Sequence, residues 1–265
     1  MRLTSFLYSR PSQWGALAGH WAASWWRMLL LGAIALVLAF SPSTYTRAHR
    51  CATSRQIYHS AWQVLPWFAA LSALVSLVII RIVLVTALSY GLSRFALEMV
   101  VRVLVLELIP LSAALFVALR AGLAFNATLL DAPAFDPGQP ASAPWQRRRD
   151  LVAEVSGNAF AVLTLAMVSS VLVLLLAYLN VYGLSPWGLD DYTRTVGRVF
   201  EPTVSIGFAL KTMLFGLAVA VIPAAAILEL QRFGGGARPS MQPGAVRLLF
   251  VLLMIEAASL AVKYF

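Results

Sequence analysis

The residues that could do chemistry are ionisable side chains inside long apolar runs. Glu107 lies about four residues into one run, and Lys211 lies about six residues into another. An ionised side chain in a membrane helix costs roughly 2.5–3.5 kcal/mol on insertion scales, so it needs a partner, a wet cavity or a route to the interface. Both charges are expected roughly 6–9 Å from the same side of the membrane. Opposite charge at equal depth predicts an ion pair; the alternative is that each side chain reaches the interface separately.

Other charges in the apolar runs have less definite partners. Arg120 and Glu229 lie near the inner ends of the same two runs, where they either pair or reach lipid headgroups. Glu256 is near the middle of the last run, and no partner can be named for it. Arg81, late in its run, is expected to extend outward to the interface.

Prolines within the runs predict local bending. Pro66, Pro110 and Pro223 each remove a backbone hydrogen bond and can kink a membrane helix. Glu107 stands one turn before Pro110, an arrangement suited to a hinge or a cavity wall.

No catalytic, cofactor or metal site is predicted. The chain has no phosphate-binding loop of the Gly-x-x-x-x-Gly-Lys-Ser/Thr type. The histidines His20, His49 and His59 all lie in the first quarter, and nothing places them near a carboxylate cluster. The single cysteine, Cys51, excludes an internal disulfide and disfavours a thiol metal site. We therefore expect that the protein is not an enzyme and carries no metal or cofactor.

Composition indicates that lipid is the solvent for much of the chain. Hydrophobic residues make up 60% and charged residues 12%, against about 45–50% and 25% in soluble domains. The net charge is +9, but the charges lie in short stretches between apolar runs. This pattern favours contact with the cytoplasmic leaflet and disfavours nucleic acid as a partner.

The apolar runs predict an all-α integral membrane protein with about five transmembrane helices. Spans are expected near 62–88, 103–125, 158–179, 205–230 and 246–264. A shorter run, 25–40, has tryptophans beside it and is interpreted as an interfacial or re-entrant helix; a signal-peptide core and a sixth span are the alternatives. We therefore divide the chain into an N-terminal cytoplasmic region, 1–54, and a five-helix domain, 55–265.

Arginines in the connecting segments predict the orientation. Three segments are the most basic, and they alternate correctly to share one side of the membrane; their arginines are Arg47, Arg50 and Arg55, then Arg147, Arg148 and Arg149, then Arg232, Arg238 and Arg247. The positive-inside rule makes that side cytoplasmic. The segments 132–150 and 231–245 are then inner loops, 182–202 is an outer loop, and the C-terminus is periplasmic.

Residues 107–122 read Glu-Leu-Ile-Pro-Leu-Ser-Ala-Ala-Leu-Phe-Val-Ala-Leu-Arg-Ala-Gly. This segment resembles a known family, the MlaE-type permeases of Mce-associated lipid ABC transporters. The family reads Arg-Glu-Leu-Gly-Pro, a small and aliphatic stretch, and then Gly-Arg-x-Gly. Further similarity runs in order from about Arg55 to the C-terminus, including Leu210-Lys211-Thr212 and Gly234-Gly235-Gly236.

The sequence departs from the family at defined positions. Leu106 replaces the arginine before Glu107, and Ile109 replaces the glycine. The family's acidic segment after this helix is absent, and Asn-Ala-Thr-Leu-Leu stands at 126–130 instead. This is the region where the family presents its coupling helix to the ATPase, so the chain is either a divergent permease or a degenerate copy that pairs with a fuller one.

The resemblance implies the function, partners and location. It implies a bacterial inner-membrane permease that moves phospholipid or a related lipid, with a second permease subunit, a cytoplasmic ABC ATPase and a periplasmic Mce-domain protein as partners. It places Glu107, Leu108 and Lys211 in an outward substrate cavity, to which we add Pro110 as the hinge. It also implies an ATPase coupling segment, formed here by Asn126, Leu130, Asp131, Arg147, Arg148 and Arg149.

Two other functions stay open at the level of sequence. One is a secondary transporter that works without an ATPase. The other is a membrane scaffold that assembles a lipid-handling complex without transporting lipid itself. The absent acidic coupling segment is the feature that keeps the scaffold open.

Overall fold

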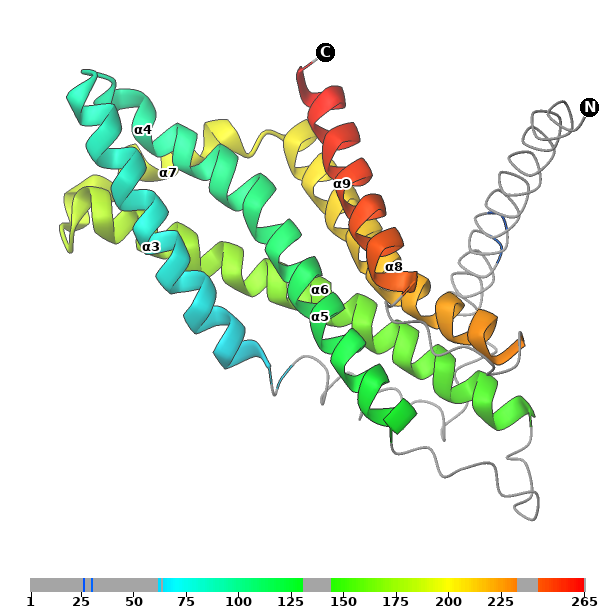
Figure 1. The fold of residues 1–265 in the computed structure, drawn as a ribbon. Coiled ribbons are helices and arrows are strands. Elements are labelled where there is room, and N and C mark those ends of the chain that lie inside the picture. The colour runs from blue at the N-terminus through cyan, green and yellow to red at the C-terminus, as the bar shows by residue number, and fades with distance from the viewer. Residues whose placement is uncertain are drawn as a thin grey trace, which may run out of the picture.

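The protein is a bundle of membrane-length helices (Figure 1). The structure is a computed structural model that describes residues 64–130, 144–232 and 243–264, with Trp26, Leu30 and Trp62. Every regular element in these residues is a helix, and five helices are long and apolar enough to cross a membrane. The prediction of an all-α membrane protein with five spans is confirmed. The N-terminal region 1–54 and the run 25–40, apart from Trp26 and Leu30, lie outside the described residues.

The five spans come from seven helical segments. They are α3 (Leu65–Ser89), the continuous unit α4 (Ser93–Val100), η3 (Val101–Leu108) and α5 (Ile109–Leu130), then α6 (Pro144–Tyr182), α8 (Pro202–Arg232) and α9 (Pro243–Tyr264). Helix α6 lies in the middle and packs against α3, α5 and α8, while α9 packs mainly on α8. The spans in α3 and α9 are the least buried of the five, so they form the outside of this subunit.

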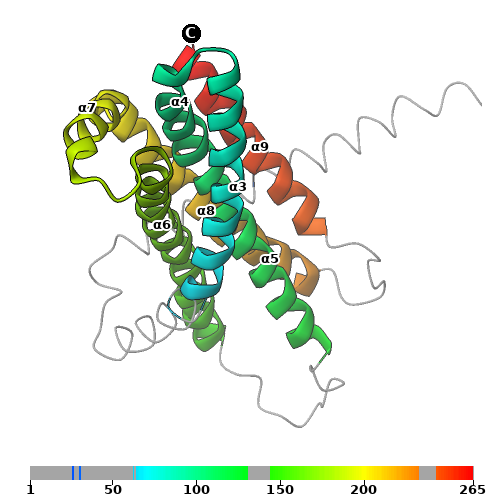
Figure 2. The ribbon, with the colours of Figure 1, turned by 90° about the vertical axis from the view of Figure 1, so that its left-hand side faces the viewer.

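The helices alternate in direction, which gives the bundle two distinct ends. The α3–α4 turn, the short helix α7 (Leu189–Val199) and the C-terminal end of α9 lie together at one end, here named the α7 end (Figures 1 and 2). The ends of α5 and α8 and the starts of α6 and α9 point the opposite way. The segments predicted to share one side, 132–150 and 231–245, therefore connect helices at one end of the bundle, opposite the C-terminus.

Two segments predicted as loops are partly helical, which corrects the sequence analysis. Helix α6 begins at Pro144, so residues 144–150 belong to a helix of 39 residues. Proline fits the first turn of a helix, where its missing N–H would have no partner. Helix α7 occupies much of the predicted outer loop 182–202. A search for long apolar runs overlooks such a helix, because it is short and amphipathic.

Tyrosine contacts hold α7 against the end of α6. The Tyr192 hydroxyl donates a hydrogen bond to the Leu174 carbonyl at 2.7 Å, and the Tyr182 hydroxyl donates to Asp191 Oδ2 at 2.7 Å. The rings of Tyr178 and Tyr192 meet edge to face, with centroids 5.2 Å apart. Burial, followed by the nearby Tyr182, raises the pKa of Tyr192 to about 12.

Two other prolines occupy different positions in their helices. Pro66 lies in the first turn of α3, at the start of its span, so it begins the helix instead of kinking it. Pro223 lies inside α8, as predicted. The α3–α4 turn needs Gly91, whose φ of 70° is a conformation that favours glycine.

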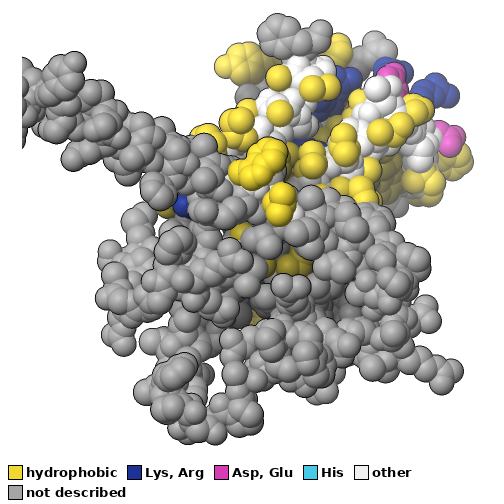
Figure 3. Space-filling model, turned by 90° about the vertical axis from the view of Figure 1, so that its right-hand side faces the viewer, with side chains coloured by type: hydrophobic (Ala, Val, Ile, Leu, Met, Phe, Trp, Pro, Cys, Tyr) yellow, Lys and Arg dark blue, Asp and Glu magenta, His cyan; other side chains and the backbone are white. Residues whose placement is uncertain are grey.

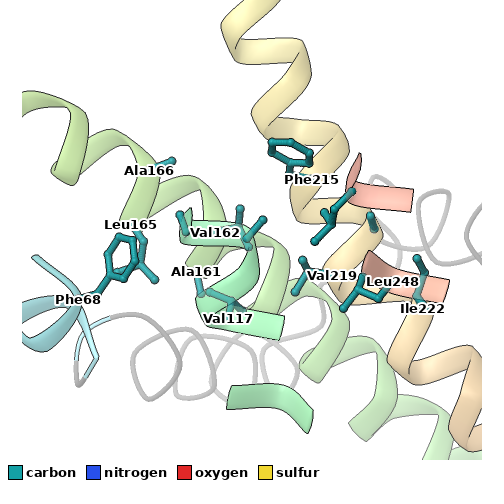
Figure 4. Close-up of a cluster of buried hydrophobic side chains, with 14 of the residues drawn as sticks. Phe68, Val117, Ala161, Val162, Leu165, Ala166, Phe215, Val219, Ile222 and Leu248 are labelled. Atoms are coloured by element: carbon teal, nitrogen blue, oxygen red, sulfur yellow. The ribbon is translucent and has the colours of Figure 1, made fainter. Parts of the chain in front are cut away.

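Buried apolar side chains from all five spans form the core that holds the bundle (Figure 4). The cluster runs from Phe68 on α3 through Val117 and Leu165 to Phe215 and Leu248. Helices α6 and α8 pack closely at Gly216, where a Cβ atom would lie 3.1 Å from the Ala159 carbonyl oxygen. In a membrane, close packing of this kind replaces the hydrophobic driving force between helices.

A side chain at Gly216 is expected to separate α6 from α8. Gly216→Val should lower the free energy of unfolding by about 1–3 kcal/mol, because the added methyl groups meet backbone that cannot move alone. Thermal unfolding of the purified protein in detergent measures the effect. Gly197→Val is the matched control, since a Cβ at Gly197 meets no atom within 4 Å. Equal melting temperatures for the two variants would contradict the close contact.

The raised pKa of Tyr192 predicts a stability loss in strong alkali. Its folded-state pKa of about 12 exceeds the usual value of 10.0. The neutral Tyr192 side chain therefore contributes to the free energy of unfolding in full below pH 10, and this contribution is lost as the pH rises through about 12. The phenolate absorbance is measured against pH for the wild type and for Tyr192→Phe. The difference between the two curves reports Tyr192 and should rise with a midpoint near pH 12. A difference titration near pH 10 would show that α7 does not bury this ring.

Candidate functional site

A network of four charged side chains crosses the interior of the bundle near its α7 end. Lys211 on α8 pairs with Glu107 on η3 and with Glu256 on α9, the latter at 2.8 Å. Lys263 on α9 pairs with the second oxygen of Glu107 at 2.9 Å. The predicted Glu107–Lys211 ion pair is confirmed, and separate routes to the interface are excluded for these two residues.

The network is electrically balanced, with two lysines against two glutamates. Only 3% of the Lys211 side-chain surface is exposed, and the ammonium also lies 5.7 Å from the centre of the Phe215 ring. Its contact with Glu256 is an ion pair without hydrogen-bond geometry, because Oε2 of that glutamate has no hydrogen-bond partner. Mutual neutralisation is what makes four charges tolerable at this depth.

A π-helical segment places Glu107. The backbone N–H of Ile109 bonds to the Leu104 carbonyl, five residues back, at the end of η3. Pro110 follows directly and has no N–H to continue the usual α-helical pattern, so the wider π turn stands where that pattern is broken. The result is that Leu106 is buried, Glu107 faces the network and Leu108 is exposed.

Two members of the network illustrate what the sequence analysis missed. Glu256 had no predicted partner, and the structure gives it Lys211. Lys263 was not singled out, because it lies at the very end of the last apolar run. Seven residues separate Glu256 from Lys263, which is two helical turns and puts both on one face of α9. That spacing is the signal that could have found Lys263.

The network borders a mostly apolar cavity of about 640 Å³ between η3, α8 and α9. This volume lies within the range of small-molecule sites. Its apolar wall includes Leu106, Val204, Phe208, Leu210, Leu214, Phe250, Val251, Met254, Ile255, Ala258 and Val262, and the charged side chains on it are Glu107, Lys211 and Lys263. In the face that Figure 3 presents, hydrophobic side chains cover much of the described surface and most charges gather at the α7 end.

The predicted site residues divide between the cavity and its surroundings. Glu107 and Lys211 line the cavity, whereas Leu108 and Pro110 are not among its lining residues. Leu108 is 39% exposed on another face, and Pro110 is buried behind the π turn. Pro110 therefore acts on the site through the backbone.

The predicted coupling segment is only partly described. Asn126 and Leu130 lie in the last turns of α5, and Arg147, Arg148 and Arg149 lie in the first turns of α6; Asp131 is outside the described residues. The side chains of these helical residues, and that of Glu229 on α8, are also outside the description, so the predicted Arg120–Glu229 contact stays a prediction.

Comparison with known families identifies the class of protein. A family model described as permease MlaE matches residues 53–129 and 149–261. The chain therefore belongs to the MlaE permease family, and it is a multi-pass permease subunit of a lipid ABC transporter. The unmatched residues 130–148 include part of the coupling segment. No curated protein and no solved structure matches the chain.

Removing the central cation is expected to destabilise the bundle. Lys211→Met leaves Glu107 and Glu256 without their shared cation in the interior. The variant should lose about 3 kcal/mol of unfolding free energy, which is the lower end of the range for broken buried ion pairs, because both carboxylates keep some exposure. The triple variant Lys211→Met, Glu107→Gln, Glu256→Gln should regain part of the loss. Thermal unfolding in detergent compares the three proteins. A Lys211→Met variant as stable as wild type would contradict the network.

Proposed function

We propose that this permease moves phospholipid between the bacterial inner membrane and a periplasmic Mce-domain protein, with the cavity beside Lys211 as the lipid site. The observation that carries the proposal is a mostly apolar cavity inside a membrane bundle with charged groups at its α7 end. A phospholipid has the same division into a long apolar part and a charged head.

The dimensions of the cavity support an acyl chain as the apolar occupant. Its wall on α9 extends from Phe250 to Val262, roughly 18 Å along the helix. That length is close to half of the ~30 Å hydrocarbon core, the share of one leaflet. Each buried CH₂ would contribute about 0.8 kcal/mol, so the chain supplies most of the affinity and the charged groups orient the head.

The arginine distribution supports an outward position for the cavity. The basic connecting segments join helices at the end opposite α7, and the positive-inside rule assigns that end to the cytoplasm. The α7 end, the charged part of the cavity and the C-terminal end of α9 then face the periplasm. An Mce-domain protein would receive or deliver lipid there, while the ATPase would bind the inner ends at Asn126, Leu130, Asp131 and Arg147, Arg148 and Arg149.

Helix movement would link ATP hydrolysis to the cavity. Pro223 interrupts the hydrogen bonding of α8, and the π turn before Pro110 does the same in the η3–α5 unit. These are the two helices that carry Lys211 and Glu107. ATP-driven closure of the inner ends, in a pair of permease subunits, would bend these helices at these points and narrow the cavity around the lipid.

Filling the cavity tests the proposal. Gly207 lines it, and a Cβ there meets no atom within 4 Å, so Gly207→Leu should occupy the lipid space without disturbing the helix packing. We expect the variant to keep its melting temperature and its partner subunits, and to lose most of its bound phospholipid and its transport of fluorescent phospholipid in proteoliposomes. Gly197→Leu on α7, equally open but outside the cavity, is the control.

The same experiment separates the alternatives. Full transport by Gly207→Leu would overturn the assignment of the cavity. A wild-type complex that binds partners but transports nothing would favour the scaffold, and transport by the isolated chain without an ATPase would favour a secondary transporter.

A further inference from the structure

One cation of the bundle lies on a surface that is otherwise suited to acyl chains. Arg81 is exposed on α3, whose membrane span is only 17% buried, while the preceding residue, Ile80, is completely buried. Helical spacing places Arg81 on one stripe with exposed apolar side chains, which are Leu74, Val78, Val85 and Leu88. Arg81 therefore projects from the outside of the subunit, and it does not line the cavity beside Lys211.

The charge of Arg81 is not balanced by the described part of the subunit. Within residues 64–130, 144–232 and 243–264, the Arg81 side chain forms no ion pair and no hydrogen bond. Glu98, on the neighbouring helix α4, already pairs with Arg102 at 2.9 Å. A charged side chain in a membrane helix needs a partner, a wet cavity or a route to the interface. The counter-ion of Arg81 is therefore to be sought in its surroundings.

Arg81 lies close enough to one headgroup layer to reach it. It stands eight residues before Ser89, the last residue of α3, which is roughly 12 Å along the helix axis. With 25 residues, α3 is roughly 37 Å long, so about 3–4 Å at each end extends beyond a hydrocarbon core of ~30 Å. The Cα atom of Arg81 is then roughly 8–9 Å below the headgroup boundary at the α7 end, a distance that an extended arginine side chain mostly covers.

The phosphate of a phospholipid is the anion that the bilayer offers at that level. A guanidinium group stays charged in proteins and can donate two parallel N–H bonds to phosphate oxygens. The acyl chains of the same lipid would run toward the bilayer centre, along the exposed side chains of Val78 and Leu74. One amphiphile therefore satisfies both the charge of Arg81 and the apolar stripe below it.

We propose that Arg81, Val78 and Leu74 form a phospholipid site on the outside of α3, with the guanidinium holding the phosphate of a lipid in the leaflet at the α7 end. This lipid is distinct from lipid in the cavity, because no residue of α3 lines that cavity. The inference goes beyond the proposed function and does not depend on it. A lipid without phosphate would leave Arg81 without its counter-ion, so the site selects for phosphate.

Quenching by brominated lipids measures this preference at a single position. In a Cys51→Ser background, a fluorescent label is attached through Val78→Cys, about one turn below Arg81. The matched control is Val171→Cys, an exposed position that lies eleven residues before the end of α6, as Val78 does in α3, on a part of α6 without Lys or Arg. The protein, with the subunits that purify with it, is reconstituted in mixtures of phosphatidylglycerol and diglucosyldiacylglycerol, with either lipid brominated.

The label beside Arg81 should report a preference for the lipid that carries phosphate. We expect about tenfold preference for phosphatidylglycerol at position 78, the effect of one charge-assisted contact, and none at position 171. Arg81→Gln should abolish the preference and keep the melting temperature, because Arg81 pairs with no described residue. Arg81→Lys should keep part of the preference, since an ammonium has the charge but not the planar fork of donors.

Three results would overturn the inference. Equal preference at positions 78 and 171 in the protein with Arg81 intact would show that the label reports the bulk bilayer. An unchanged preference in Arg81→Gln would show that Arg81 does not hold the phosphate. A label at position 78 that neither brominated lipid quenches would show that a partner protein covers this face of α3. The proposed function is tested separately, because none of these results alters the outcome expected for Gly207→Leu.

Discussion

The ion network around Lys211 is the constraint on which the rest of the bundle depends. A single charge in a membrane helix is expensive, yet this protein places four where three helical units meet. They are tolerable only together, since each lysine neutralises a carboxylate from another helix. The network therefore fixes the relative register of η3, α8 and α9 more firmly than apolar contacts, which compete with lipid tails of the same polarity.

The cavity lies beside that network, between the same three helical units, and three of the four charged side chains line it. Away from the charged groups, the cavity walls consist mostly of Leu, Phe, Val and Met side chains, as expected for helices in lipid. A space with an ionic rim and apolar walls is suited to an amphiphile. The π turn before Pro110 contributes by aiming Glu107 inward while Leu108 points away.

Sequence reasoning recovered the parts of this structure that follow from hydropathy and charge. The five spans come from the cost of exposing backbone and charge to lipid, and the Glu107–Lys211 pair comes from equal depth and opposite sign. Helix α7 was missed because its eleven residues are amphipathic and lie outside any long apolar run. The partner of Glu256 was missed because pairing across three helices depends on how they rotate, which hydropathy does not encode.

The role of Leu108 shows a subtler limit of the sequence. It stands beside Glu107, and the resemblance to the family placed both in the cavity, but the π-helical register turns Leu108 toward the outside of this subunit. An ordinary helical period does not predict that rotation, because each residue that a π turn inserts shifts the side chains that follow by about 100° around the helix axis. The backbone hydrogen bonding of this segment decides which of its side chains face the cavity.

Site-specific photo-crosslinking tests most directly whether the cavity holds transported lipid. A photoreactive residue at Phe208, on the cavity wall, is compared with one at Ile206, an exposed position of the same helix that does not line the cavity. The account predicts that Phe208 captures phospholipid in the resting complex and that ATP turnover reduces the capture, while Ile206 reports bulk bilayer lipid that is insensitive to ATP. Equal, ATP-insensitive capture at both positions, or no lipid at Phe208, would contradict it.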